Sequence, residues 1–193
     1  MTENNQTYNI KPADRLSQVA EYYFSRKLKE IDRLNAEGKD IVSLAIGSPD
    51  MPPSRQTIDK LCEVARQAGS HGYQPTMGTP ELRQAMAGFY KRWYGVSIDP
   101  QTEIQPLIGS KEGILHITLA FVNTGDKVLV PNPGYPTYTS LSKLLGAEVV
   151  TYNLREDDGW QPDSEQLEAM DLTGDRLMWT NYPNMPTGAP ARM

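Results

Sequence analysis

The chain has 193 residues, of which 38% are hydrophobic and 22% charged, a composition that suits one globular domain or a domain with an appendage. Its formal net charge of −5, without a long basic run, argues against nucleic-acid binding, and its single cysteine excludes an intrachain disulfide. No apolar run approaches the ~20 residues of a membrane span, and the start, MTENNQTYNI, lacks the order of a secretion signal, so we expect a soluble cytoplasmic protein.

The first third of the chain predicts two helices separated by a short strand. Apolar side chains at helical spacing predict a helix over residues 13–36. The run IVSLAIG, residues 41–47, predicts a buried strand, which the prolines of SPDMPP then interrupt. A second helix is expected over 54–68, with Ser54 as its N-cap and Cys62 packed on its apolar side.

The next helix has the clearest ends in the chain. Thr79 can cap it, Pro80 suits its first turn, and Gly95 suits its end. Its apolar side chains are spaced so that they form one broad face, made of Leu82, Ala85, Met86, Phe89, Tyr90 and Trp93.

Beyond residue 95, strands and helices are expected to alternate. The expected strands are EIQPLIG, KVLVP, AEVVTYNL and RLMWTNYP, and the expected helices between them lie around residues 113–122, 137–145 and 163–170. Strand and helix in this alternation predict βαβ units, that is, an α/β protein with a mostly parallel sheet and helices on both faces.

Three loops at predicted strand ends carry unusual residues. Residues 109–113, GSKEG, lead into a helix whose first N–H groups can bind an anion, although an ordinary capped turn explains them too. The constrained loop PNPGYP aims the ring of Tyr135, either to stack on a flat ligand or to pack on its neighbours. A third loop, YPNMPTG, is equally rigid. Because ligands collect at such strand ends, the residues predict a pocket for a flat, anionic ligand.

Five motifs, in order, resemble those of the class I and II aminotransferases, which are pyridoxal-phosphate enzymes of fold type I. They are SLAIGSPD, HGYQPTMGTPELRQA, LIGSKEGILH, DKVLVPNPGYPTY and YPNMPTG, and the SKEG and PNPGYP forms are most similar to the branch that contains LL-diaminopimelate aminotransferases. The resemblance implies an N-terminal arm and helix contributing to the small domain over 1–50. It also implies the N-terminal part of the cofactor-binding large domain, with an incomplete sheet, over 51–193.

The resemblance also implies how pyridoxal 5'-phosphate is bound. Ser110, Lys111 and Glu112 would form the loop that holds its phosphate, and Tyr135 would stack on its pyridine ring. In the family an asparagine just before PTG hydrogen-bonds the cofactor's phenolic oxygen, whereas this chain has Met185 there, whose thioether cannot donate such a bond.

Other implied roles concern a second subunit and the substrate. Tyr73 matches a tyrosine that reaches the phosphate of the partner subunit's cofactor, so the resemblance implies a homodimer with a shared active site. Gly47 matches the glycine that approaches the substrate carboxylate. Cis peptide bonds are expected before Pro133 and Pro186.

The implied activity is transfer of an amino group between an amino acid and a 2-oxo acid, but the family's Schiff-base lysine lies beyond the PTG loop. We therefore expect a fragment that is inactive alone, with no catalytic residue and no metal ligand of its own, and with apolar surface that makes it poorly soluble in isolation. A lyase or decarboxylase of the same fold is an alternative. A noncatalytic truncated relative, acting as a binding or regulatory module, is another.

Overall fold

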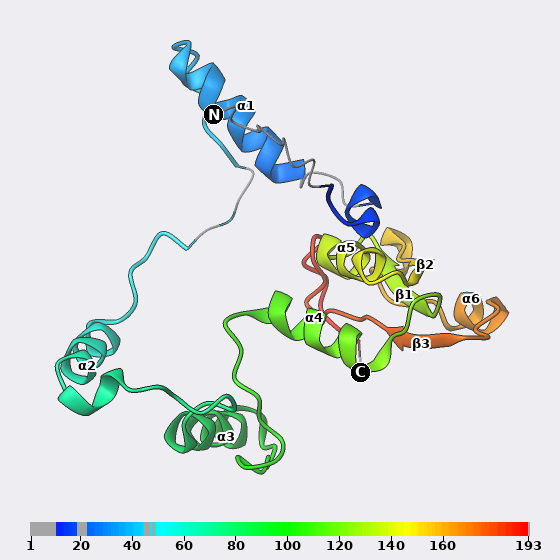
Figure 1. Ribbon diagram of the computed structural model, residues 1–193. Helices are drawn as coiled ribbons and strands as arrows, with labels where there is room; N and C mark the ends of the chain where they lie inside the picture. The colour runs from blue at the N-terminus through cyan, green and yellow to red at the C-terminus, as the bar shows by residue number, and fades with distance from the viewer. Residues whose placement is uncertain (1–10, 19–22, 45–46, 48, 193) are drawn as a thin grey trace, which may run out of the picture. The chain divides into compact units, whose positions relative to one another are not determined.

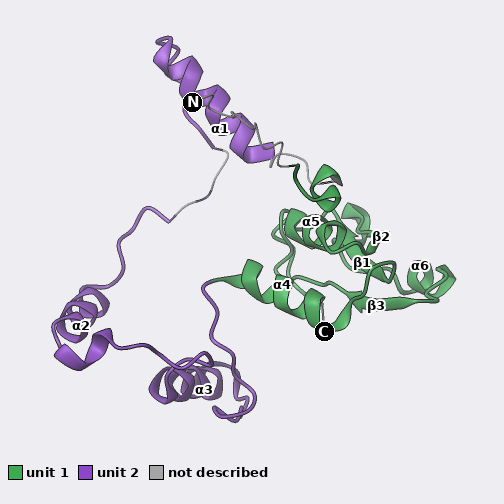
Figure 2. Cartoon of the chain, in the orientation of Figure 1, with its two compact units in different colours: residues 1–21, 109–193 green, residues 22–108 purple. Residues whose placement is uncertain are grey.

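A computed structural model describes residues 11–18, 23–44, 47 and 49–192 of the chain (Figure 1). The chain divides into two compact units (Figure 2): unit 1 contains residues 1–21 and 109–193, and unit 2 contains residues 22–108. The expected domain boundary at residue 50 stays a prediction. In the described part of the chain, no helix combines the length and the apolar character that crossing a membrane requires.

Unit 1 is built on a parallel sheet of three strands in the order β2-β1-β3 (Figure 1). The strands are β1 (Lys127–Asn132), β2 (Glu148–Asn153) and β3 (Asp175–Met178). The central strand β1 carries the apolar run Val128, Leu129 and Val130, all of which are buried. Such a continuous run is typical of a parallel strand covered on both faces, as the sequence predicted.

Helices cover both faces of this sheet. The elements are α4 (Ser110–Phe121), α5 (Pro136–Leu144), the 3-10 turn η3 (Glu156–Asp158) and α6 (Ser164–Ala169). On one face, Val128 and Val130 pack with Ile114 of α4 and Tyr138 of α5. On the other face, Leu129 packs in a second cluster to which α6 contributes Leu167. Because successive side chains of a strand point to opposite faces, β1 supplies both cores and the predicted α/β architecture is confirmed.

Unit 2 consists of helices whose ends follow local sequence signals. The helices are α1 (Tyr23–Ala36), α2 (Arg55–Ala65), the 3-10 turn η2 (Ala68–His71) and α3 (Pro80–Tyr94). The hydroxyls of Ser54 and Thr79 each accept a hydrogen bond from a first-turn N–H at 3.2 Å, as expected of N-caps. Gly95, with φ 69°, ends α3 in the left-handed conformation that glycine adopts without strain.

Two predicted strands are not formed. Residues 41–44 carry no strand and Val42 is 82% exposed, while residues 45 and 46 of the expected strand lie outside the described residues. Residues 103–109 contain bends and irregular chain but no strand, and Pro106 within them has no N–H for a ladder. An apolar run becomes a strand only by pairing with a neighbour, and neither segment pairs within the described part of the chain.

Other expectations for the N-terminal half also need correction. The helix expected over 13–36 is a 3-10 turn, η1 (Asp14–Gln18), followed by α1, with residues 19–22 outside the described part. Cys62 is exposed rather than packed, because the apolar side of α2 is not covered: Leu61 on the same helix is exposed too. Helical spacing predicts which side chains share a face but not what covers that face.

Arg83 of α3 is hydrogen-bonded to the turn at residues 100–102, which follows this helix in the chain. Its Nη1 donates to the backbone carbonyl oxygens of Pro100 at 2.9 Å and Gln101 at 3.1 Å. We expect Arg83→Met, which keeps the aliphatic stem, to lower the free energy of unfolding by about 1–2 kcal/mol, because two hydrogen bonds are lost, one of them partly buried. Arg92→Met, at an exposed position of the same helix, is the control and should change it by less than about 0.5 kcal/mol. Equal urea midpoints for the two variants would contradict the expectation.

Candidate functional site

The candidate residues of unit 1 follow the carboxyl end of β1 or begin α4. Since all three strands are parallel, the loops after β1 and β3 leave the same edge of the sheet. Tyr135 follows β1 and directly precedes α5, and the loop of Met185 follows β3. The sheet therefore brings to one edge two of the three loops singled out in the sequence.

The start of α4 is suited to an anion. The N-caps of α2, α3 and α6 are Ser54, Thr79 and Asp163, each of which accepts from first-turn N–H groups. In contrast, α4 has Gly109 as its N-cap, a residue with no side chain to cap the helix. A Cβ placed on Gly109 would meet no described atom within 4 Å. There is therefore room beside Gly109 at the positive end of this twelve-residue helix, where a phosphate could accept from first-turn N–H groups.

Lys111 brings the start of α4 together with Tyr135. Its Nζ lies over the Tyr135 ring, 5.8 Å from the ring centroid, within the range of a cation–π contact. Ser110 and Glu112 flank Lys111 in the first turn of the helix. One place in unit 1 therefore combines a helix N-terminus, a hydroxyl, an ammonium group and an aromatic ring. This donor set fits a ligand made of an anionic group joined to a flat ring.

The loop that carries Tyr135 has little freedom. A Cβ on Gly134 would lie 2.4 Å from the carbonyl oxygen of Pro131 and 2.7 Å from its Cγ, so no larger residue fits without moving the loop. The Asn132–Pro133 and Met185–Pro186 peptide bonds are cis, as the resemblance implied, and so is Tyr182–Pro183.

Two further aromatic residues, Tyr138 and Trp179, lie behind Tyr135. The rings of Tyr135 and Tyr138 meet edge to face, with centroids 5.6 Å apart and planes at 87°. Tyr138 in turn stacks on Trp179, with centroids 4.9 Å apart and planes at 10°. Burial raises the pKa of the Tyr138 hydroxyl, so this side chain stays neutral. Sequence reasoning missed both residues, since 41 positions separate them and no local pattern links a helix to the end of a distant strand.

The loop after β3 uses Asn184 for its own structure. Asn184 is 2% exposed, and its side-chain amide donates to the Thr187 hydroxyl at 2.9 Å. Its backbone N–H donates to the carbonyl oxygen of Ala189 at 2.8 Å, and its carbonyl accepts from Gly188. Met185, the next residue, is 42% exposed. The loop therefore presents a thioether where the resemblance leads one to expect an amide.

Tyr73 and Gly47 belong to unit 2, not to the unit that contains Ser110 and Tyr135. Tyr73 is 96% exposed, and Gly47 is exposed with no described atom within 4 Å of a built Cβ. Their assigned roles stay predictions.

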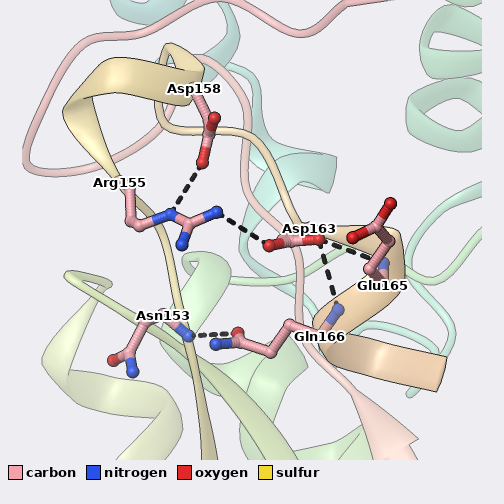
Figure 3. A network of polar contacts seen from close by, with 6 residues as sticks. All are labelled: Asn153, Arg155, Asp158, Asp163, Glu165 and Gln166. Carbon is pink, nitrogen blue, oxygen red and sulfur yellow. Dashed lines mark hydrogen bonds and ion pairs between the residues drawn. The ribbon is translucent and has the colours of Figure 1, made fainter. Parts of the chain in front are cut away.

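A charged network holds the segment between β2 and α6 (Figure 3). Arg155 Nε donates to Asp158 at 2.7 Å and its Nη2 to Asp163 at 2.9 Å, and the bond to Asp158 is the largest cause of a raised Arg155 pKa. Asp163 also caps α6, while the Gln166 side chain accepts from the backbone N–H of Asn153 at 2.9 Å. Because these charged groups pair with one another, the network is structural rather than a ligand site.

Comparison with known proteins gives a consistent match. Residues 39–192 match the family model described as aminotransferase class I and II. The chain is 42% identical over 182 residues to an LL-diaminopimelate aminotransferase of Dehalococcoides mccartyi, covering 94% of this chain and 47% of that protein. The chain thus spans about half the length of the curated relatives it matches.

Solved structures agree with this match. The apo-BacF structure of Bacillus subtilis is 38% identical with a TM-score of 0.87, covering 95% of this chain and 47% of that one. An alanine aminotransferase from Pyrococcus furiosus is 30% identical with a TM-score of 0.84, covering 93% of this chain and 46% of that one.

Proposed function

The chain belongs to the class I and II aminotransferases, and we propose that the whole protein moves an amino group between an amino acid and a 2-oxo acid with pyridoxal 5'-phosphate. The family depends on this cofactor, and the names of the relatives support the reaction. One observation carries the proposal: the Nζ of Lys111, a residue in the first turn of α4, lies 5.8 Å from the Tyr135 ring centroid, so the side chain of this turn reaches the stacking ring.

The residues of unit 1 fit this cofactor. The N–H groups at the start of α4, from Ser110 to Glu112, would hold the phosphate together with the Ser110 hydroxyl. The Tyr135 ring would fix the plane of the pyridine ring by stacking. When bound, the cofactor supplies the electron sink for chemistry at the substrate carbon, whereas these side chains bind and orient.

Two residues of unit 2 complete the proposal. We assign Tyr73 to the phosphate of the partner subunit's cofactor in a homodimer, and its 96% exposure supports a contact outside its own unit. We assign Gly47 to the substrate carboxylate, because the absence of a side chain allows close approach of the backbone. A cytoplasmic location stays a prediction from the sequence.

The visible absorption spectrum of the full-length protein tests this function. We expect added pyridoxal phosphate to bind and its spectrum to change with an amino acid, LL-diaminopimelate and alanine being the first to try because relatives carry those names. Amino-group transfer should then require an acceptor 2-oxo acid. Release of ammonia without an acceptor would favour the lyase alternative, and failure to bind the cofactor would favour a noncatalytic relative.

Met185 is expected to weaken cofactor binding. Asn184 does not take the place of the usual asparagine, because its side chain is only 2% exposed and its amide donates to Thr187 inside the loop. We therefore expect Met185→Asn to add one hydrogen bond and lower the dissociation constant of pyridoxine 5'-phosphate about 3- to 10-fold. This ligand lacks the aldehyde of the cofactor, so it reports noncovalent binding alone. Met185→Leu, which adds no donor, should give no gain, and an equal gain from leucine would contradict the explanation.

A further inference from the structure

We propose that Tyr138 and Trp179 are positioning residues that set the plane of the Tyr135 ring. This inference rests on the proposed function, in which Tyr135 stacks on the ring of the cofactor. It assigns to one buried and one partly buried aromatic residue, neither of which need touch a ligand, control over how well a ring-bearing ligand binds. Binding of a bare phosphate at the start of α4 would not depend on them.

Trp179 is held by its backbone on both sides. Its N–H donates to the carbonyl oxygen of Leu129 on β1 at 2.9 Å. Its carbonyl accepts from the hydroxyl of Tyr152 on β2 at 2.6 Å, and burial raises the pKa of Tyr152, so this hydroxyl keeps the proton that it donates. These two bonds fix the backbone of Trp179 beside β1 and β2, and with it the point from which the indole extends.

The indole plane is chosen by stacking. Trp179 Nε1 is buried, and within the described residues it has no hydrogen-bond acceptor. A buried donor without an acceptor is unfavourable, so another interaction must hold the indole in this orientation. The near-parallel stack on Tyr138, at 4.9 Å and 10°, is that interaction.

Because its own ring is held in place, Tyr138 restricts the orientation of the Tyr135 ring. Tyr138 is 6% exposed and belongs to the same core cluster as Val128 and Val130, so its ring has little room to turn. It meets Tyr135 edge to face at 87°, one of the arrangements that aromatic pairs favour over a face-to-face sandwich. Lys111 lies over the Tyr135 ring as well. Tyr135 is therefore oriented by contacts from α5 and α4 in addition to its own loop.

Binding of two ligands to the full-length protein tests the proposal: pyridoxine 5'-phosphate, which has ring and phosphate, and inorganic phosphate, which has no ring. We expect Tyr138→Leu to raise the dissociation constant of pyridoxine phosphate at least fivefold, and that of inorganic phosphate less than twofold. Tyr138→Phe keeps the ring and should restore binding. Tyr94→Leu, the same change at an exposed tyrosine of α3, is the matched control and should bind both ligands as the unaltered protein does.

A second pair of variants, at Trp179, tests the same inference in case Tyr138→Leu does not fold. Trp179→Leu removes the stack and should reproduce the selective loss, whereas Trp179→Phe keeps an aromatic ring and should not. NMR of ring-labelled Tyr135 without ligand gives a second readout. In the unaltered protein we expect slow ring flipping, seen as separate signals for the two edges of the ring. In Trp179→Leu we expect fast flipping, which averages these signals into one.

The possible failures are distinguishable. If the unaltered protein binds pyridoxine phosphate and both leucine variants bind it equally well, the positioning role is wrong while the proposed function stands. An equal loss of both ligands in the folded variants also overturns the positioning role, since it indicates general damage. If the unaltered protein does not bind pyridoxine phosphate, the proposed function and this inference fall together.

Discussion

Val128→Asp is expected to unfold unit 1. Val128 is 0% exposed in the central strand, where it lies opposite Val149 of β2 and Leu177 of β3 and packs against Ile114. A carboxylate there would lose its hydration, and protonation to avoid the charge would still leave a buried polar group. We expect a loss of more than about 4 kcal/mol in the free energy of unfolding, a large part of the ~5–15 kcal/mol that stabilises a typical protein.

Circular dichroism and urea unfolding measure this effect. Val42→Asp makes the same substitution where the side chain is 82% exposed, so it should shift the free energy of unfolding by no more than about 0.5 kcal/mol. Cooperative unfolding of Val128→Asp at the midpoint of the unaltered protein would show that β1 is not the centre of the core.

Tyr135→Ala is expected to cause the largest loss of ligand binding. Stacking of a heterocycle on an aromatic side chain contributes ~1–3 kcal/mol by alanine substitution in nucleic-acid complexes, so we expect the dissociation constant of pyridoxine 5'-phosphate to rise about 5- to 150-fold. Inorganic phosphate, which would contact only the start of α4, should bind nearly as before. Tyr135→Phe keeps the ring and should keep most of the affinity.

Fluorescence titration or calorimetry of the three proteins measures these constants. The prediction depends on Tyr135 as the stacking face rather than as a structural side chain. An alanine variant that binds both ligands as tightly as the unaltered protein would remove Tyr135 from the site. If the alanine variant also bound inorganic phosphate more weakly, by a similar factor, this would instead indicate that the loop after β1 stabilises the start of α4.

Much of the fold was predictable from local patterns. Ser54, Thr79 and Gly95 act at helix ends within a few residues of themselves, so their chemistry is visible in sequence. The apolar run of β1 likewise predicts a strand buried on both faces. The strands expected over 41–47 and 103–109 are not found in the part of these segments that the structure describes, because pairing depends on a distant segment that no local pattern names.

By itself, therefore, the sequence determined the alternation of strands and helices from α4 onward, several helix ends and, through its motifs, the family. It also singled out Lys111 and Tyr135 as residues of one ligand site, but not their direct contact. Only the tertiary structure decided that contact, the stack of Tyr138 on Trp179, and the internal bonding of Asn184. The physical reason is the range of the interactions: caps and turns involve neighbours in the chain, whereas ring contacts and strand pairing join residues that only folding brings together.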